Sequence, residues 1–243
     1  MEKKLNKKTY KKNLINKIFF NIFYFKTKYR KNYFLKNNIY KKYFNDFNKL
    51  LQKNTYTKLE PHYKQRFYEI NKIINKYNIK KIVEIGSGRT TFIFNLYSNL
   101  DITSYEQDKR WIEILTSYFK KIKLKYNIIH SNVIKYKNGA KLNFKESIIP
   151  DLLYIDGPYI NRKSEFDTFT GKPAYYDFEF FFKKNMPKII MIEGRTDTVD
   201  EILKNKNSIN YKFYPEFIYC IQRKKYFSAF AFRRHSLFIK KDL

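Results

Sequence analysis

Cysteine is almost missing from this 243-residue chain: Cys220 is the only one, which excludes internal disulfides and multi-cysteine metal sites. Glycine and proline are scarce as well, with six of each. The longest apolar cluster near the start, residues 18–25, is far shorter than the ~20 residues that a membrane-spanning helix requires. No cleavable signal sequence is recognisable, so we expect a cytoplasmic protein without a transmembrane span, and leave peripheral contact at a membrane surface open. Cys220 lies in an apolar, strand-like run and is expected to be a buried thiol.

Acidic residues are few relative to basic ones, 22 against 51, and the formal net charge is +29. Such a charge attracts RNA or anionic lipid non-specifically at low salt. Only nine of the basic residues are arginine, whereas dedicated nucleic-acid readers favour arginine for bidentate contacts. Lys, Asn, Ile, Tyr and Phe are abundant and share A- and T-rich codons, so a base-biased genome would also produce this composition. The charge alone therefore assigns no polyanion partner.

Residues 1–60 differ in composition from the rest of the chain. They hold 17 Lys or Arg against three acids and contain neither Gly nor Pro. Apolar residues recur there at helical spacing, which predicts two or three basic amphipathic helices. We interpret this extension as a cap on a second domain, residues 61–243, that shapes its substrate pocket. The alternative is an arm that binds a membrane surface or nucleic acid.

The stretch Lys81–Thr91 is the most informative in the chain. A β-branched run leads into two glycines, Gly86 and Gly88, and a helix-compatible segment follows. This order predicts a strand, a tight turn and a helix, an arrangement that lets backbone approach a nucleotide-like ligand closely. Eighteen residues after Gly88, a second predicted strand ends in Glu106, where a carboxylate can accept hydrogen bonds from ribose hydroxyls. An ordinary βα turn with a solvated Glu106 is the alternative.

The glycine pattern discriminates between cofactors. A third glycine, as in G-x-G-x-x-G, is absent, and so is the phosphate-binding G-x-x-x-x-G-K-[ST]. The acid-x-G-x-G pattern formed by Glu84 and the two glycines resembles motif I of class I S-adenosylmethionine-dependent methyltransferases. The resemblance implies S-adenosylmethionine as cofactor, with an acid useful near its cationic sulfonium and ammonium groups. It further implies a set of cofactor-binding residues: Glu84, Gly86, Ser87, Gly88, Thr90, Glu106, Asn132 and Asp156.

The resemblance extends in order and spacing over residues 61–243. It implies an α/β fold with a doubly wound, mostly parallel, seven-stranded sheet, and the composition of residues 1–60 adds a basic helical extension in front. A helix is expected from Pro61 to about Tyr77, and residues 135–147 are expected to be a loop with a short edge strand. Residues 209–240 suit strands six and seven, with a basic turn at 233–235. The other elements are expected as strands at 80–86, 101–106, 126–130, 150–156 and 187–193, and helices at about 90–99, 108–121, 175–184 and 197–206.

The catalytic candidates end predicted strands four and five. Asp156 and Tyr159 resemble the [DNS]-P-P-[YF] turn of amino-group methyltransferases, except that glycine replaces the first proline. Glu193 could act as a base or fix a substrate hydroxyl, and Arg195 could clamp an anionic group; the alternative is an internal Glu–Arg pair at the end of the strand. Asp156 and Glu193 could together hold a divalent ion, but the Asp-Asn pair of catechol-type enzymes is missing, so no metal is predicted. By the same resemblance, Asn132 would contact adenine.

Three functions fit these patterns. The leading one is an S-adenosylmethionine-dependent methyltransferase that acts on a small or carbohydrate-like metabolite. The second is an RNA or DNA methyltransferase that uses the basic residues 1–60 to hold its substrate. The third is a methyltransferase-like binding protein that has lost turnover. The residue types at the predicted cofactor turn argue against the third, and the lack of a recognisable nucleic-acid module argues mildly against the second.

Overall fold

The structure is a computed structural model, and backbone contacts divide its chain into two units. One consists of residues 1–72 and 215–233, and the other of residues 73–214 and 234–243. Within 1–60, only residues 46–47 and 49–50 are described; they are helical, and Phe47 is buried, so the predicted amphipathic extension lies otherwise outside the described residues. The structure describes residues 46–47, 49–50, 63–95, 99–144, 148–158, 174–184, 186–214, 217–220, 225–228 and 235–243.

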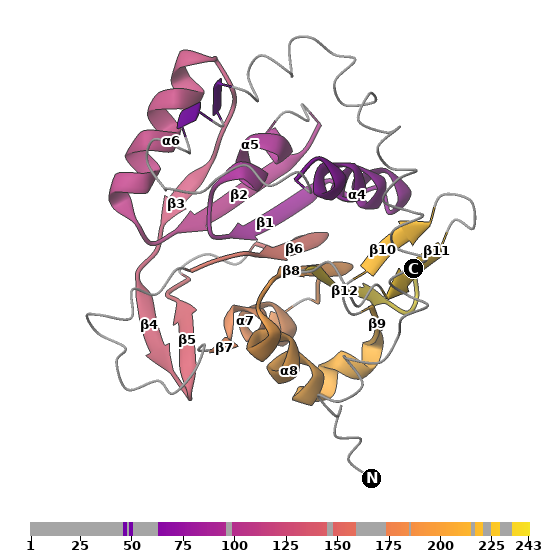
Figure 1. Cartoon of the computed structure of the whole chain (residues 1–243). Helices are drawn as coiled ribbons and strands as arrows, with labels where there is room; N and C mark the ends of the chain where they lie inside the picture. Colours follow the sequence, from indigo (N-terminus) through magenta and orange to yellow (C-terminus); the bar gives the residue numbers. More distant parts are fainter. Residues whose placement is uncertain are drawn as a thin grey trace. The chain divides into compact units, whose positions relative to one another are not determined.

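A seven-stranded sheet in the order β3-β2-β1-β6-β8-β12-β9 organises the second unit (Figure 1). Strand β12 runs antiparallel to its neighbours β8 and β9, and the remaining pairs are parallel. The predicted α/β fold with a mostly parallel seven-stranded sheet is therefore confirmed. Its strands are β1 Lys81–Ile85, β2 Asp101–Glu106, β3 Ile128–His130, β6 Leu152–Ile155, β8 Ile189–Glu193, β9 Tyr211–Tyr214 and β12 His235–Lys240.

The central strands form because their sequences are continuous apolar runs. Strand β6 reads LLYI and β8 reads IIMIE, and every residue of both is buried. Such runs are typical of parallel strands that are covered on both faces. Side chains alternate between the faces, so Val83 and Ile85 of β1 join a core cluster that includes residues of α7 Asp177–Lys184 and α8 Thr196–Lys204. On the other face, Phe94 of α5 Arg89–Asn95 packs edge-on against Tyr154 of β6.

The helices also lie close to their expected positions. Helix α4 spans Tyr63–Lys76, and α6 spans Lys109–Lys121. Asp108 caps α6, because its side chain accepts a hydrogen bond from Trp111 N at 3.1 Å. Helix α8 is followed by a 3₁₀ turn, η2 Lys206–Asn210, that leads into β9.

One expectation was wrong in the region before β6. Residues 133–142 form a hairpin, β4 Val133–Tyr136 and β5 Gly139–Leu142, and β7 Ala174–Tyr175 pairs with β5 to make a separate three-stranded sheet. A loop with an edge strand was expected here, and the hairpin was missed because the residues of the segment are polar. The Asn138-Gly139 dipeptide, a common hairpin signal, was the available clue, although Lys137 and Asn138 form the observed turn and Gly139 begins β5.

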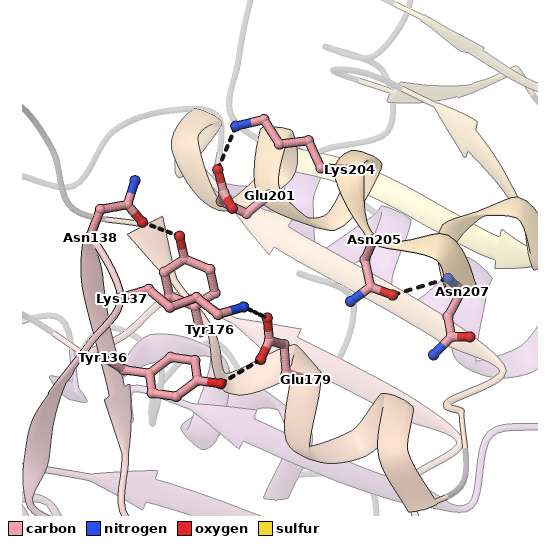
Figure 2. A network of polar contacts seen from close by, with 9 residues as sticks. All are labelled: Tyr136, Lys137, Asn138, Tyr176, Glu179, Glu201, Lys204, Asn205 and Asn207. Atoms are coloured by element: carbon pink, nitrogen blue, oxygen red, sulfur yellow. Dashed lines mark hydrogen bonds and ion pairs between the residues drawn. The ribbon is translucent and has the colours of Figure 1, made fainter.

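Polar side chains fasten this hairpin to α7 (Figure 2). Glu179 accepts hydrogen bonds from Tyr136 Oη at 3.0 Å and from Lys137 Nζ at 2.5 Å, and Tyr176 donates to Asn138. Lys137 has a φ of 53°, which places it in the left-handed region at the turn. The β4–β5 hairpin is thus held against α7, and Tyr175 lies in the third strand of this small sheet.

Strands β9 and β12 fill the places expected for strands six and seven. Between them, β10 Phe217–Cys220 and β11 Lys225–Ser228 pair as an antiparallel hairpin that belongs to the other unit, and this hairpin was not expected. Cys220 ends β10. Its side chain is not among those that the structure describes, so its predicted burial stays a prediction. His235 begins β12 instead of lying in a turn, whereas the preceding two residues of the expected basic turn lie outside the described residues.

Candidate active site

Four parallel strands bring the predicted site residues to one edge of the sheet. In the register of the central strands, Ile85 lies opposite both Tyr105 and Ile155. The residues that follow β1 and β6, and those that end β2 and β8, therefore meet at the carboxyl edge. Strand β1 also has β2 on one side and β6 on the other, so the chain reverses its winding there, and ligands bind at such a switch point in open α/β sheets.

Gly86 and Gly157 pack against each other at this edge. Gly86 has a φ of +87°, and a Cβ atom on it would lie 2.5 Å from Gly157 Cα; a Cβ on Gly157 would be similarly close to Gly86 Cα. Hydrogen bonds from Gly86 N to Tyr105 O at 2.8 Å and from Gly157 N to Ile85 O at 2.6 Å fix the two turns. The glycine that replaces the first proline of the expected catalytic turn is thus required by this contact.

Gly88 differs from Gly86. A Cβ atom on Gly88 would meet nothing within 4 Å among the described residues. The first glycine of the G-x-G pattern therefore serves close packing, and beside the second the described residues leave open space. That space lies at the end of β1, where a ligand can approach the backbone.

Glu84 is enclosed by hydroxyl groups. The side chain is fully buried, and its carboxylate accepts hydrogen bonds from Thr90 Oγ1, from Thr91 Oγ1 at 2.6 Å and from Ser104 Oγ at 2.6 Å. Burial raises its pKa to about 7, although the three hydroxyl groups lower it. These contacts show Glu84 and Thr90 bracing the turn between β1 and α5; their predicted contact with a cofactor stays a prediction.

Glu106 holds the glycine turn from the end of β2. One carboxylate oxygen accepts from Ser87 N at 2.8 Å and Ser87 Oγ at 3.0 Å. The other accepts from Gln107 N at 2.9 Å and Asp108 N at 3.0 Å. The side chain is buried, and desolvation raises its pKa against the effect of these donors. Glu106 therefore ends β2, as predicted, and orders the turn; its predicted contact with a ribose stays a prediction.

Trp111 contributes a contact that the sequence did not predict. Its indole Nε1 donates to Ser87 O at 2.9 Å, so Ser87 is held through its N–H, its hydroxyl and its carbonyl. Gly88 N donates to Thr91 Oγ1 at 2.6 Å, which closes the turn onto α5. Contacts within the protein thus fix the backbone of the turn.

Arg195 and Asp156 meet beside the turn. The Arg195 guanidinium donates to the backbone carbonyl of Asp156 and lies over the Tyr175 ring, 4.4 Å from its centroid. Tyr175 N in turn donates a hydrogen bond to Thr198 Oγ1 at 2.9 Å. Glu193, also buried at this edge, accepts from Tyr154 Oη at 2.7 Å. The structure thus brings three of the predicted catalytic residues to one rim, and Tyr159 lies outside the described residues.

Asp177 is a buried acid close to this rim that the sequence did not single out. It has no exposed surface, and Oδ1 accepts from Leu142 N at 2.8 Å. Among the described residues, its Oδ2 has no hydrogen-bond partner. Burial raises its pKa to about 7, and the backbone hydrogen bond from Leu142 and the nearby positive charge of Arg195 lower it only in part.

The raised pKa of Asp177 predicts a pH-dependent stability. In the unfolded chain the carboxyl group ionises near its ordinary pKa of 3.8, while in the folded chain it stays protonated up to about 7. Its stabilising contribution is therefore complete below about pH 4 and is lost as pH rises through about 7. We expect urea unfolding to show Asp177→Asn gaining about 1–3 kcal/mol relative to the unmodified protein between pH 5 and pH 8. A difference that does not vary with pH would contradict this.

Asn132 and its neighbour His130 lie at the end of β3. Asn132 is exposed, and its backbone carbonyl accepts a hydrogen bond from Asn143 N at 3.0 Å. His130 Nε2 lies 3.2 Å from Gln107 O. The predicted contact of Asn132 with adenine stays a prediction. In the part of the chain that the structure describes, no group of three His, Cys, Asp or Glu side chains is arranged to hold a metal ion. None of the described helices combines the length and apolarity that crossing a membrane would require.

These geometries correspond to a known fold. No protein-family model and no curated protein matches the chain. Among solved structures, the chain shares the fold of S-adenosylmethionine-dependent methyltransferases over most of its length. A candidate caffeoyl-CoA O-methyltransferase from Staphylococcus aureus is 13% identical, with 94% of this chain and 100% of that chain covered and a TM-score of 0.50. A candidate O-methyltransferase from Klebsiella pneumoniae is 8% identical, with 82% and 89% covered and a TM-score of 0.50.

Proposed function

We propose that this protein is an S-adenosylmethionine-dependent methyltransferase that acts on the hydroxyl or amino group of a small or carbohydrate-like metabolite. The observation that carries the proposal is the carboxyl edge at the switch point. There, no described atom lies within 4 Å of a Cβ placed on Gly88, Glu106 ends the neighbouring strand, and Asp156 follows the strand on the other side. Two of the structural neighbours, both described as candidate O-methyltransferases, support the same chemistry.

The residues of the edge fit a donor that carries a ribose and a cationic sulfonium. Gly88 leaves room at the turn, and Glu106 supplies a carboxylate for ribose hydroxyls. When bound, the cofactor supplies an electrophilic methyl group. Asp156 and Glu193 would orient an acceptor hydroxyl or amine toward it, and orientation accounts for much of the rate of a bimolecular transfer. Arg195 stiffens this rim because it holds the Asp156 carbonyl and stacks on Tyr175.

A nucleic-acid substrate is the second candidate, because the net charge of +29 would concentrate any polyanion near the protein. Incubation with methyl-labelled S-adenosylmethionine and separate metabolite and RNA fractions of cell extract distinguishes the two. We expect label in the metabolite fraction. Label confined to RNA at physiological salt would favour the second candidate, and cofactor binding without label in any fraction would favour a binding protein.

A further inference from the structure

Glu106 is fully engaged by the protein itself. Each of its two carboxylate oxygens accepts two hydrogen bonds, with donor distances between 2.8 and 3.0 Å. A carboxylate has about four lone-pair positions, so no acceptor position is left for another donor. A ribose diol that binds to Glu106 therefore has to displace at least one of the four donors.

The four donors differ in how easily they can leave. Three are backbone N–H groups, of Ser87, Gln107 and Asp108, whose positions are set by the path of the chain. The fourth is the Ser87 hydroxyl, which leaves by rotation about a single side-chain bond. Trp111 and Glu106 hold the Ser87 backbone through its carbonyl and its N–H, so this rotation does not require the turn to move.

We propose that the Ser87 hydroxyl occupies, in the free protein, the position on Glu106 that a ribose hydroxyl takes in the complex, and that it rotates away when the cofactor binds. This inference rests on the proposed function, because it assumes a ribose-containing ligand at this edge. Ser87 then acts as an internal competitor that weakens cofactor binding. Ser87 was predicted to support cofactor binding. Removal of its hydroxyl would weaken binding in that role and strengthen binding if the hydroxyl is a competitor.

Titration calorimetry with S-adenosylhomocysteine on the full chain tests the inference. Ser87→Ala keeps the backbone N–H bond to Glu106 but removes the competing hydroxyl. We expect it to bind about two- to tenfold more tightly than the unmodified protein, the range given by the net value of one hydrogen bond. Ser117→Ala is the matched control, because Ser117 is exposed on α6, and its affinity should not change.

The 2′-deoxy and 3′-deoxy analogues of S-adenosylhomocysteine supply a second, independent measurement. In the unmodified protein, the analogue that lacks the competing ribose hydroxyl should bind less than about threefold more weakly than S-adenosylhomocysteine, because the Ser87 hydroxyl keeps its hydrogen bond to Glu106. In Ser87→Ala, removal of the same ribose hydroxyl should lower the affinity distinctly more. Such non-additivity is the signature of coupled sites in a double-mutant cycle.

The outcomes separate this inference from the proposed function. The inference is overturned if Ser87→Ala binds S-adenosylhomocysteine no more tightly than the unmodified protein does. It is also overturned if the substitution strengthens binding of both deoxy analogues as much as it strengthens binding of S-adenosylhomocysteine. Either result leaves the proposed function standing. Absence of binding by the unmodified protein contradicts the proposed function itself.

Discussion

Gly86→Ala is expected to destabilise the sheet unit by about 2–5 kcal/mol, because it combines a left-handed backbone conformation with an overpacked contact. Gly86 has a φ of +87°, and its Cβ would lie 2.5 Å from Gly157 Cα. The neighbouring atom is backbone and cannot rotate away, so the turns after β1 and β6 would have to separate. Gly157→Ala should destabilise through the same contact, but less, by about 1–3 kcal/mol. Urea unfolding measures both.

Gly88→Ala is the matched control for this result. The same methyl group placed there meets no described atom within 4 Å, so stability should stay within about 0.5 kcal/mol. Cofactor binding, however, should weaken if the open space beside Gly88 is where the ligand lies. Equal stability of Gly86→Ala and Gly88→Ala would show that the two turns are not packed as described.

Asp156→Ala is expected to lower turnover about a hundredfold or more while leaving cofactor affinity nearly intact, the range assigned to a positioned acid or base. The variant keeps the backbone contacts of this position, which are the hydrogen bond from Asp156 N to Ile85 O at 2.9 Å and the carbonyl that accepts from Arg195. The carboxylate alone is removed. Single-turnover methyl transfer to the acceptor found in the metabolite fraction measures the effect.

Asp151→Ala serves as the control at the opposite end of the same strand. Asp151 accepts from Lys80 N at 2.8 Å and pairs with Lys188 at 2.8 Å, so its loss should reduce stability without a specific loss of turnover. If Asp156→Ala reduces stability as Asp151→Ala does but leaves turnover unchanged, Asp156 orders its loop and the acceptor binds elsewhere.

Most of the sheet could be predicted because its strands are short segments rich in apolar and β-branched residues that end in a glycine turn or an acid. Strand β2 was predicted at its observed bounds, 101–106, and β1, β6 and β8 within one or two residues at each end. The hairpin β4–β5 was missed because its strands are short and polar, and a hairpin depends on pairing that local hydrophobicity does not reveal. The hairpin between β9 and β12 was missed because its aromatic residues equally suit a strand of the main sheet.

The site was predictable in position but not in its internal contacts. Gly86 and Glu106 were found because a strand, a glycine turn and an acid recur at a fixed spacing. Trp111 and Asp177 were not, since each contacts residues more than twenty positions away, Ser87 and Leu142 respectively. The hydroxyl groups around Glu84 show the same limit, because Ser104 comes from the adjacent strand and only the register of β1 and β2 brings it there.

The most direct test of the central claim is a calorimetric titration of the full chain with S-adenosylmethionine, with NADH as the competing dinucleotide. We expect saturable one-to-one binding of S-adenosylmethionine that Glu106→Ala weakens by about 1–3 kcal/mol, the usual loss for a hydrogen bond to a charged group. NADH should bind more weakly, because the turn lacks the third glycine of dinucleotide-binding sites. Tighter binding of NADH than of S-adenosylmethionine would contradict the assignment of this edge as a methyl-donor site.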